Sequence, residues 1–372
     1  MNGLVQIDIF ADARRRTGQQ EEISEEGFQL FLPPQNDLKE SLIAMLQRNI
    51  LFKKLYGAAD GGQGIAYFMG KIGGNFAGKF GFMPWILTHH PYGYTIAEVF
   101  GPVFFVMVGF GYRMSFLRRK EQYGLAEARC SAARRYTLLI LLGLVVYFGH
   151  FWDALTHIGI AGLLILPVID RPARMRLVAA AFFLATFQAC YLHTGYGEWV
   201  MSRGKSLNGG PLAAMSWGFM VVFGTLVYDL WATRNSRRIT AGLIIWALPL
   251  CAAGLLLTFP WPGVKEAWPF TRYGMSMPYP VFATGVALLI YLAFYWFCDV
   301  YRLRLPLVSP LGANPLLMYG IIGAFVGLSR VAVHYLGEPS FHTSLAVYIA
   351  VSLAIYSIAR LLYQHGLVLR FS

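Results

Sequence analysis

The sequence predicts an all-α membrane protein: a polytopic transmembrane helix bundle of about nine or ten spans with an N-terminal amphipathic extension. Of its 372 residues, 56% are hydrophobic and 16% are aromatic, and only 13% are charged, against about a quarter in soluble globular domains. Long apolar segments recur along most of the chain, and arginines gather between them. Together these observations indicate a multi-pass integral membrane protein rather than a soluble protein of two domains.

The apolar segments after residue 92 are each long enough to span or nearly span a bilayer, which takes roughly 20 residues per helix. They lie near residues 93–117, 136–152, 154–169, 176–195, 211–231, 238–258, 278–298, 310–335 and 342–366. We therefore assign residues 93–368 to one transmembrane bundle and residues 369–372 to a short tail.

The arginine-rich loops orient the bundle through the positive-inside rule. The loops contain these basic residues: Arg118, Arg119, Lys120, Arg129, Arg134, Arg135, Arg171, Arg174, Arg176, Arg234, Arg237, Arg238, Arg302 and Arg304. They alternate with aromatic loops that contain fewer arginines, so we place the basic loops and the C-terminus in the cytoplasm, with a bacterial cytoplasmic (inner) membrane as the expected location. Orientation in the membrane then explains the net charge of +12, and we expect membrane lipids and no nucleic acid as partners.

The first 61 residues differ from the bundle. They contain clusters of basic and acidic residues, and in LKESLIAMLQRNILFKKLYG the apolar residues recur every three or four positions. This spacing is typical of an amphipathic helix on a membrane or against a partner. We expect a cytoplasmic extension, which is either a solvated tail with one surface helix or a docking element for other membrane protein subunits.

A glycine-rich stretch at residues 62–88 decides the number of spans. Nine spans ending in the cytoplasm would leave the N-terminus outside, and a tenth span here would bring it inside. Small residues recur at every fourth position: Gly62, Ala66, Gly70, Gly74 and Gly78. Such a pattern lets helices approach closely in membranes, although Lys71 and Lys79 would each cost about 2.5–3.5 kcal/mol near mid-bilayer. We predict a protein-packed span and then an outer loop to residue 92, with a glycine-rich loop or an interfacial segment as the alternative.

Two neighbouring histidines, His89 and His90, precede the apolar helix that contains Glu98. An imidazole titrates near neutrality and can act as a general base, and an ionisable residue inside a span is a candidate for function. We take these three residues as the candidate catalytic group. The alternatives are solvated loop histidines and an acid at the level of the lipid headgroups.

A second polar group lies in the outer turn YFGHFWDALTHIG. On a helix, Asp153 and His157 would share one face at a spacing of four, and bundling of the spans would bring them near the histidine pair. They could orient a base, contact a substrate or bind a metal. A zinc site also requires defined geometry that this spacing does not establish, so we predict no metal site.

The segment from Gly93 to Ser115, with T-I-A-E, then Pro102, then F-F-V-M-V-G, is followed far along the chain by PFTRYGMSMPYPVFATGVA and PLGANPLLMYG. These segments resemble, in order and spacing, the motifs of the heparan-α-glucosaminide N-acetyltransferase-like family of membrane acyltransferases. The matching positions near the C-terminus are Arg272, Asp299, Gly312, Asn314 and Tyr319. The resemblance covers roughly residues 85–365, whereas the first-span signature of the family, R-x-x-x-x-D-x-x-R-G, is absent from residues 40–90.

The resemblance implies transfer of an acetyl or acyl group from cytoplasmic acyl-CoA, as co-substrate, to a sugar or other acceptor on the outer side. It implies that His89 or His90 activates the acceptor or carries the acyl group, and that Glu98, where the family usually has aspartate, orients it. The other assignments are CoA binding by Asn314, Arg134 and Arg135, and substrate binding by Arg272, Asp153 and His157.

The missing first-span signature leaves a second function open. Because that helix helps to line the acyl-transfer site in the family, its replacement by the glycine-rich stretch puts activity in question. The alternative is a non-catalytic structural subunit of a larger membrane protein complex, derived from the same fold and docked through residues 1–92. A transporter of a small or lipid-linked solute is the third possibility.

Overall fold

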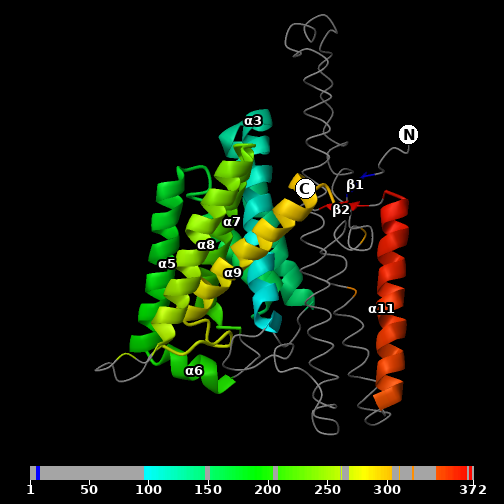
Figure 1. Ribbon diagram of the computed structural model, residues 1–372. Helices are drawn as coiled ribbons and strands as arrows, with labels where there is room; N and C mark the ends of the chain where they lie inside the picture. Colours follow the sequence, from blue (N-terminus) through cyan, green and yellow to red (C-terminus); the bar gives the residue numbers. More distant parts are fainter. Residues whose placement is uncertain are drawn as a thin grey trace, which may run out of the picture.

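The computed structural model describes residues 6–8, 96–146, 151–203, 208–259, 261, 268–303, 310, 321, 341–366 and 368–370. These residues form a helical bundle, which confirms the predicted all-α class (Figure 1). Among them the two β-strands are β1 (Gln6–Asp8) and β2 (Val368–Arg370), and these three-residue strands pair in parallel. The predicted amphipathic helix and the predicted spans near 62–88 and 310–335 lie outside the described residues.

The described helices are α3 (Ile96–Val146), α4 (Ala154–Ile165), α5 (Ala173–His193), α6 (Tyr196–Arg203), α7 (Ala214–Ala232), α8 (Ser236–Thr258), α9 (Pro278–Phe294) and α11 (Phe341–Gln364). A 3-10 turn, η5 (Pro211–Ala213), leads into α7, and a π-helical turn, η6 (Tyr295–Val300), continues α9. Four helices are long and apolar enough to cross a membrane: α5, α7 with η5, α8, and α9 with η6. They confirm four predicted spans and the multi-pass membrane class.

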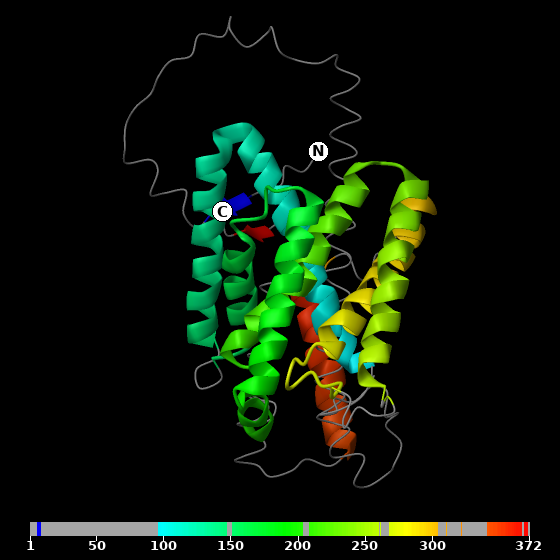
Figure 2. The ribbon, with the colours of Figure 1, turned by 90° about the vertical axis from the view of Figure 1, so that its left-hand side faces the viewer.

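Helix α3 consists of two arms joined by a sharp reversal. At Gly124 the backbone has φ 86° and ψ 172°, a conformation that glycine adopts without the steric penalty of a side chain. The chain turns back on itself there, and the arms run side by side (Figure 2). The arms correspond to the predicted spans near 93–117 and 136–152, but the basic segment between them, which we predicted to be a loop, continues both helices.

Helix α4 corrects the predicted span near 154–169. It has only 12 residues, and at 1.5 Å per residue it is too short to cross the hydrocarbon core alone. It packs against the second arm of α3 through glycines. At both Gly159 and Gly162 an added Cβ would collide with Tyr136, so these two positions allow the two helices to approach closely.

The centre of the bundle is the crossing of α3 and α7. Gly109 of α3 faces the backbone of Val221, and Gly224 of α7 faces the backbone of Val106. An added Cβ at either glycine would overlap the opposite carbonyl oxygen. Small residues of this kind permit backbone-to-backbone packing in membranes, and the glycines therefore set the separation of the two helices.

The outer faces of the bundle are apolar. Large hydrophobic side chains are exposed on α5, α8 and α11, including Phe182, Ile245 and Leu353. Water-exposed surfaces rarely present large contiguous apolar patches. The pattern is the one expected where helices face lipid.

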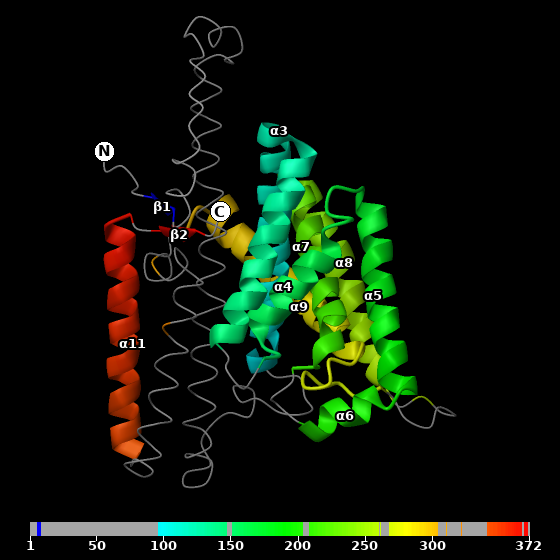
Figure 3. The ribbon, with the colours of Figure 1, turned by 180° about the vertical axis from the view of Figure 1, so that it is seen from behind.

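The basic turns lie at one end of the bundle. The reversal in α3, the α4–α5 turn and the α7–α8 turn lie together at the top of Figures 1 and 2, and η6 reaches the same level. Helix α6 and residues 268–277 lie at the opposite end, as Figure 3 shows from behind. We call these the basic end and the aromatic end. The alternation predicted from the arginines thus matches the path of the chain.

Candidate functional site

Three segments that are far apart in the sequence bring predicted site residues to the aromatic end. Glu98 lies in the first turn of α3, Asp153 and His157 lie at the start of α4, and Arg272 lies in the segment before α9. His89, His90 and Asn314 lie outside the described residues. The structure therefore brings together four of the six residues that we predicted to be catalytic or substrate-binding: Glu98, Asp153, His157 and Arg272.

Glu98 and Arg272 form a buried ion pair that joins α3 to the segment before α9. Arg272 Nε and Glu98 Oε2 are 2.8 Å apart, and the exposed fractions of the two side chains are 21% and 2%. The atoms are within ion-pair distance but lack the alignment of a hydrogen bond. The Tyr279 hydroxyl donates to the backbone carbonyl of Glu98 at 2.8 Å. A carboxylate is also favourable in the first turn of a helix because the helix dipole is positive there.

The ion pair shifts the pKa values of Arg272 and Tyr273, two residues that lie outside the spanning helices. Burial lowers the pKa of Arg272, but the carboxylate of Glu98, with smaller contributions from Tyr279, Tyr273 and Asp153, reverses the shift and leaves the pKa raised. Burial raises the pKa of Tyr273, against the opposing charge of Arg272. The Arg272 guanidinium lies 5.7 Å from the centre of the Tyr273 ring. Arg272 therefore stays charged, and Tyr273 stays neutral, at physiological pH.

Asp153 and His157 hold the start of α4 against residues 208–210. Asp153 is the N-cap of α4 and accepts from the backbone N–H of Ala154 at 2.7 Å and from Asn208 Nδ2 at 3.3 Å. His157 is fully buried, and its Nδ1 and Nε2 lie 3.1 and 3.0 Å from the carbonyl oxygens of Asp153 and Gly210. Both ring nitrogens thus face the backbone, so the ring supports the local structure as well as lying near the predicted site.

The turn at residues 208–210 is a part of the site that the sequence analysis did not include. Asn208, Gly209 and Gly210 all have positive φ, a region that asparagine and glycine adopt more readily than other residues. Tyr196 donates to the carbonyl of Gly209 at 2.7 Å and accepts from the backbone N–H of Leu212 at 3.0 Å. The sequence Asn-Gly-Gly is a turn signal and could have identified this segment.

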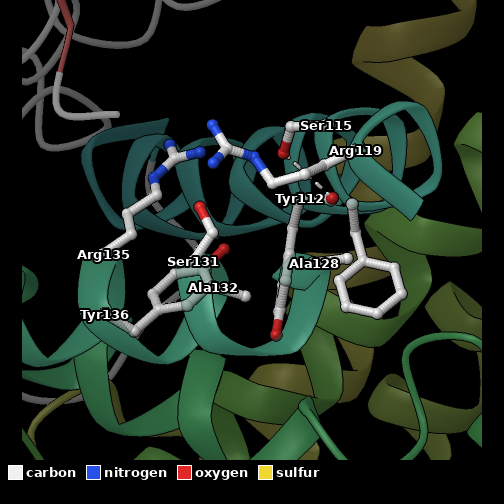
Figure 4. Close-up of a pocket in the computed structure, with 9 residues that line it drawn as sticks. Tyr112, Ser115, Arg119, Ala128, Ser131, Ala132, Arg135 and Tyr136 are labelled. Atoms are coloured by element: carbon white, nitrogen blue, oxygen red, sulfur yellow. Dashed lines mark hydrogen bonds between the residues drawn. The ribbon is translucent and has the colours of Figure 1, made fainter. Parts of the chain in front are cut away.

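A second polar region lies at the basic end, where we predicted CoA binding by Arg134 and Arg135. Arg134 is exposed on the second arm of α3, whereas Arg135 is partly buried and lines a pocket between the two arms (Figure 4). Arg119 of the first arm lines the same pocket. Of the two predicted arginines, only Arg135 lines this pocket. It does so together with Arg119, which the sequence analysis did not select.

Near the same end of the bundle, two arginines share one carboxylate. Arg113 Nε lies 3.0 Å from Asp229 Oδ1, and the fully buried Arg176 binds the other oxygen of Asp229 and the hydroxyl of Thr225. Arg113 also donates to the carbonyl of Ile169. The cluster ties α3, α5 and α7 together and leaves one positive charge in excess.

Within the described part of the chain, no three His, Cys, Asp or Glu side chains are placed to hold a metal ion. A comparison with protein-family models gave no match. A search of curated proteins also gave no match. The resemblance to membrane acyltransferases therefore stays a prediction based on the motifs.

Proposed function

We propose that this protein is a membrane acyltransferase that moves an acetyl or acyl group from acyl-CoA at the basic end to a sugar or other acceptor at the aromatic end. The observation on which the proposal rests is the 2.8 Å ion pair between Glu98 and Arg272. These two residues belong to the two motif segments that resemble the family, and they are far apart in the sequence. Membership of one functional site would explain why Glu98 and Arg272 lie in contact.

The two ends of the bundle support complementary roles. At the aromatic end, Glu98 lies in the first turn of the helix that follows His89 and His90. In the proposal one of these histidines accepts a proton from the acceptor while the acceptor's oxygen or nitrogen attacks the acyl carbonyl. The thioester bond breaks and the CoA thiolate leaves. At the basic end, the guanidinium of Arg135 is partly buried beside a pocket and fits the phosphates of CoA, which are anions.

Release of CoA from acetyl-CoA by the purified protein in nanodiscs tests this proposal. We expect acceptor-dependent release that falls by a factor on the order of 10²–10⁴ when the general base is removed, in either His89→Ala or His90→Ala. His193→Ala is the matched control, because His193 is an exposed histidine at the end of α5. Absence of acyl-CoA-dependent turnover with sugar acceptors, together with absence of CoA binding, would overturn the proposal.

The second candidate is a non-catalytic subunit of a larger membrane complex, docked through residues 1–92. One observation favours it: both nitrogens of the buried His157 face backbone carbonyls, and Asp153 caps a helix, so these groups already serve the fold. Co-purification with other membrane proteins in fixed stoichiometry, without CoA binding, would support this candidate. Loss of that association on removal of residues 1–92 would locate the docking segment.

We also propose that the basic end faces the cytoplasm of a bacterial inner membrane, because the positive-inside rule favours that orientation. Cys130 is exposed on the second arm of α3 near the reversal. A membrane-impermeant maleimide should therefore label Cys130 in inside-out vesicles and not in intact spheroplasts, in a variant whose other three cysteines are serine. Labelling in intact spheroplasts would reverse the orientation.

A further inference from the structure

A pocket of about 60 Å³ lies between the two arms of α3 at the basic end (Figure 4). Its polar lining comes from Tyr112, Ser115, Arg119, Ser131, Arg135 and Tyr136. One water molecule needs roughly 10–15 Å³ of such space. The pocket therefore has room for several water molecules or for one small anionic group.

Two positive charges face each other at this pocket. Figure 4 shows the guanidinium groups of Arg119 and Arg135 side by side, one from each arm. The carboxylate that pairs with Arg119 is that of Glu127, which is 3.9 Å away and 53% exposed. In the described part of the chain no carboxylate pairs with Arg135. Two like charges that line one pocket repel each other, the exposed Glu127 carboxylate offsets only one of them from a distance of 3.9 Å, and an anion in the pocket would reduce that repulsion.

The hydroxyl of Tyr136 supplies an independent observation. The Tyr136 side chain is 1% exposed, and its hydroxyl has no hydrogen-bond partner among the described residues. A buried polar group in this state costs free energy until a partner is found. Tyr136 lines the same pocket, and Ser131 lies between it and the two guanidinium groups (Figure 4). The pocket thus offers hydrogen-bond donors and positive charge without a competing acidic group in its lining.

We infer that this pocket binds a phosphate group. An ionised phosphate presents acceptor oxygens and negative charge, and arginines bind it in fork-like geometry. The ligand is either the headgroup of an anionic phospholipid at the membrane surface or the phosphate of a soluble ester. The inference does not depend on acyl transfer, because a structural subunit could use the same pocket to bind an anionic lipid.

Thermal unfolding of the full chain tests the inference with two probes. The first is inorganic phosphate, added to protein in neutral detergent at constant ionic strength with chloride as the reference anion. The second is phosphatidylglycerol, mixed into phosphatidylcholine nanodiscs and compared with phosphatidylcholine alone. A rise in Tm with both probes indicates a site for phosphate from either source, and a rise with phosphatidylglycerol alone assigns the site to lipid headgroups.

Variants decide whether the pocket is responsible. We expect Arg119→Gln and Arg135→Gln each to weaken binding by about tenfold or more, because each removes a charge-assisted hydrogen bond. Arg118→Gln is the matched control: Arg118 is the exposed neighbour of Arg119 and does not line the pocket. Tyr136→Phe is a variant that should fold normally, because the hydroxyl it removes has no hydrogen-bond partner among the described residues. Tyr136→Phe should keep the Tm of the free protein while weakening binding by roughly tenfold.

Two results would overturn the inference. One is the absence of a Tm rise with either probe in the wild-type protein. The other is a rise that stays the same size when Arg119 and Arg135 are both replaced by glutamine. A rise lost equally in Arg118→Gln would assign the effect to the general positive charge of this end, and would also refute the site.

Discussion

The two ends of the bundle differ in how far their charged side chains are neutralised by opposite charges. At the aromatic end each buried charge has an opposite partner, since Arg272 lies 2.8 Å from Glu98. At the basic end positive charge is in excess: Arg113 and Arg176 share Asp229, and Arg119 and Arg135 line one pocket, where among the described residues the carboxylate that pairs with Arg119 is that of the exposed Glu127.

This difference separates stabilising charges from binding charges. Removal of one partner from a buried ion pair leaves the other charge unpaired and destabilises the protein. Removal of one of two like charges at a pocket relieves repulsion. We therefore expect substitutions at the aromatic end to lower stability, and substitutions of Arg119 or Arg135 to lower ligand affinity without lowering the stability of the free protein.

The largest expected effect is at Glu98. Glu98→Ala leaves the Arg272 guanidinium without its counter-charge, and we expect a loss of about 3 kcal/mol, the low end of the range for broken buried pairs, because Arg272 keeps 21% exposure. Reversible unfolding in detergent micelles measures it. Glu98→Leu combined with Arg272→Met removes both charges and should recover most of the stability. Wild-type stability in Glu98→Ala alone would show that the pair does not stabilise this end.

The helix crossing between the two ends gives the next effect. Gly224→Ala places a methyl group against the backbone carbonyl of Val106, and we expect a loss of about 1–3 kcal/mol from overpacking. Gly218→Ala on the same helix is the control, because its nearest neighbour atom would be 3.8 Å away. Equal stability of the two variants would mean that α3 and α7 are not packed as closely as described.

A smaller effect is expected at Asp153. Asp153→Ala removes the N-cap of α4 and the acceptor for Asn208, at about 1 kcal/mol for a lost cap. Asp153→Asn keeps an acceptor oxygen and should lie close to the wild type in the same unfolding measurement. If both variants lose acyl transfer while only Asp153→Ala loses stability, Asp153 acts on the substrate as well as on the helix.

The smallest effect is a dependence on alkaline pH. Burial raises the pKa of Tyr196 from 10.0 to about 12, against the opposing hydrogen bond from Leu212. The folded state therefore holds this proton more tightly than the unfolded state, so the contribution to stability is complete below pH 10 and is lost as the pH rises to about 12. Tyr196→Phe should show a flatter decline in stability over that interval. An unchanged slope would indicate that the hydroxyl is open to solvent.

The positions of the spans were predictable where hydropathy alone determines them. Helices α5, α7, α8 and α9 fall within one to several residues of the predicted segments, because each is a run of about 20 apolar residues. Hydropathy failed at the reversal of α3, where basic residues were predicted to form a loop. That segment is rich in alanine and arginine, which are strong helix formers, and a hydropathy scale does not register this propensity.

The candidate sites were only partly predictable. The motif resemblance selected Glu98 and Arg272, but their separation of 2.8 Å depends on how the segment before α9 folds back onto α3. Arg135 was selected for a basic loop, whereas Arg119 and Tyr136 were not selected. Their meeting requires the reversal at Gly124, which places residues of two arms opposite each other.

The sequence by itself determined the membrane class, the position of most helices and the alternation of basic and aromatic turns. These properties follow from the local cost of placing each side chain in lipid, which adds up along the chain. The tertiary structure alone decided which charges are neutralised and which are left facing each other. That outcome depends on distances between residues remote in sequence, which are set by the glycine contacts of α3 with α7, by the reversal at Gly124 and by the segment before α9.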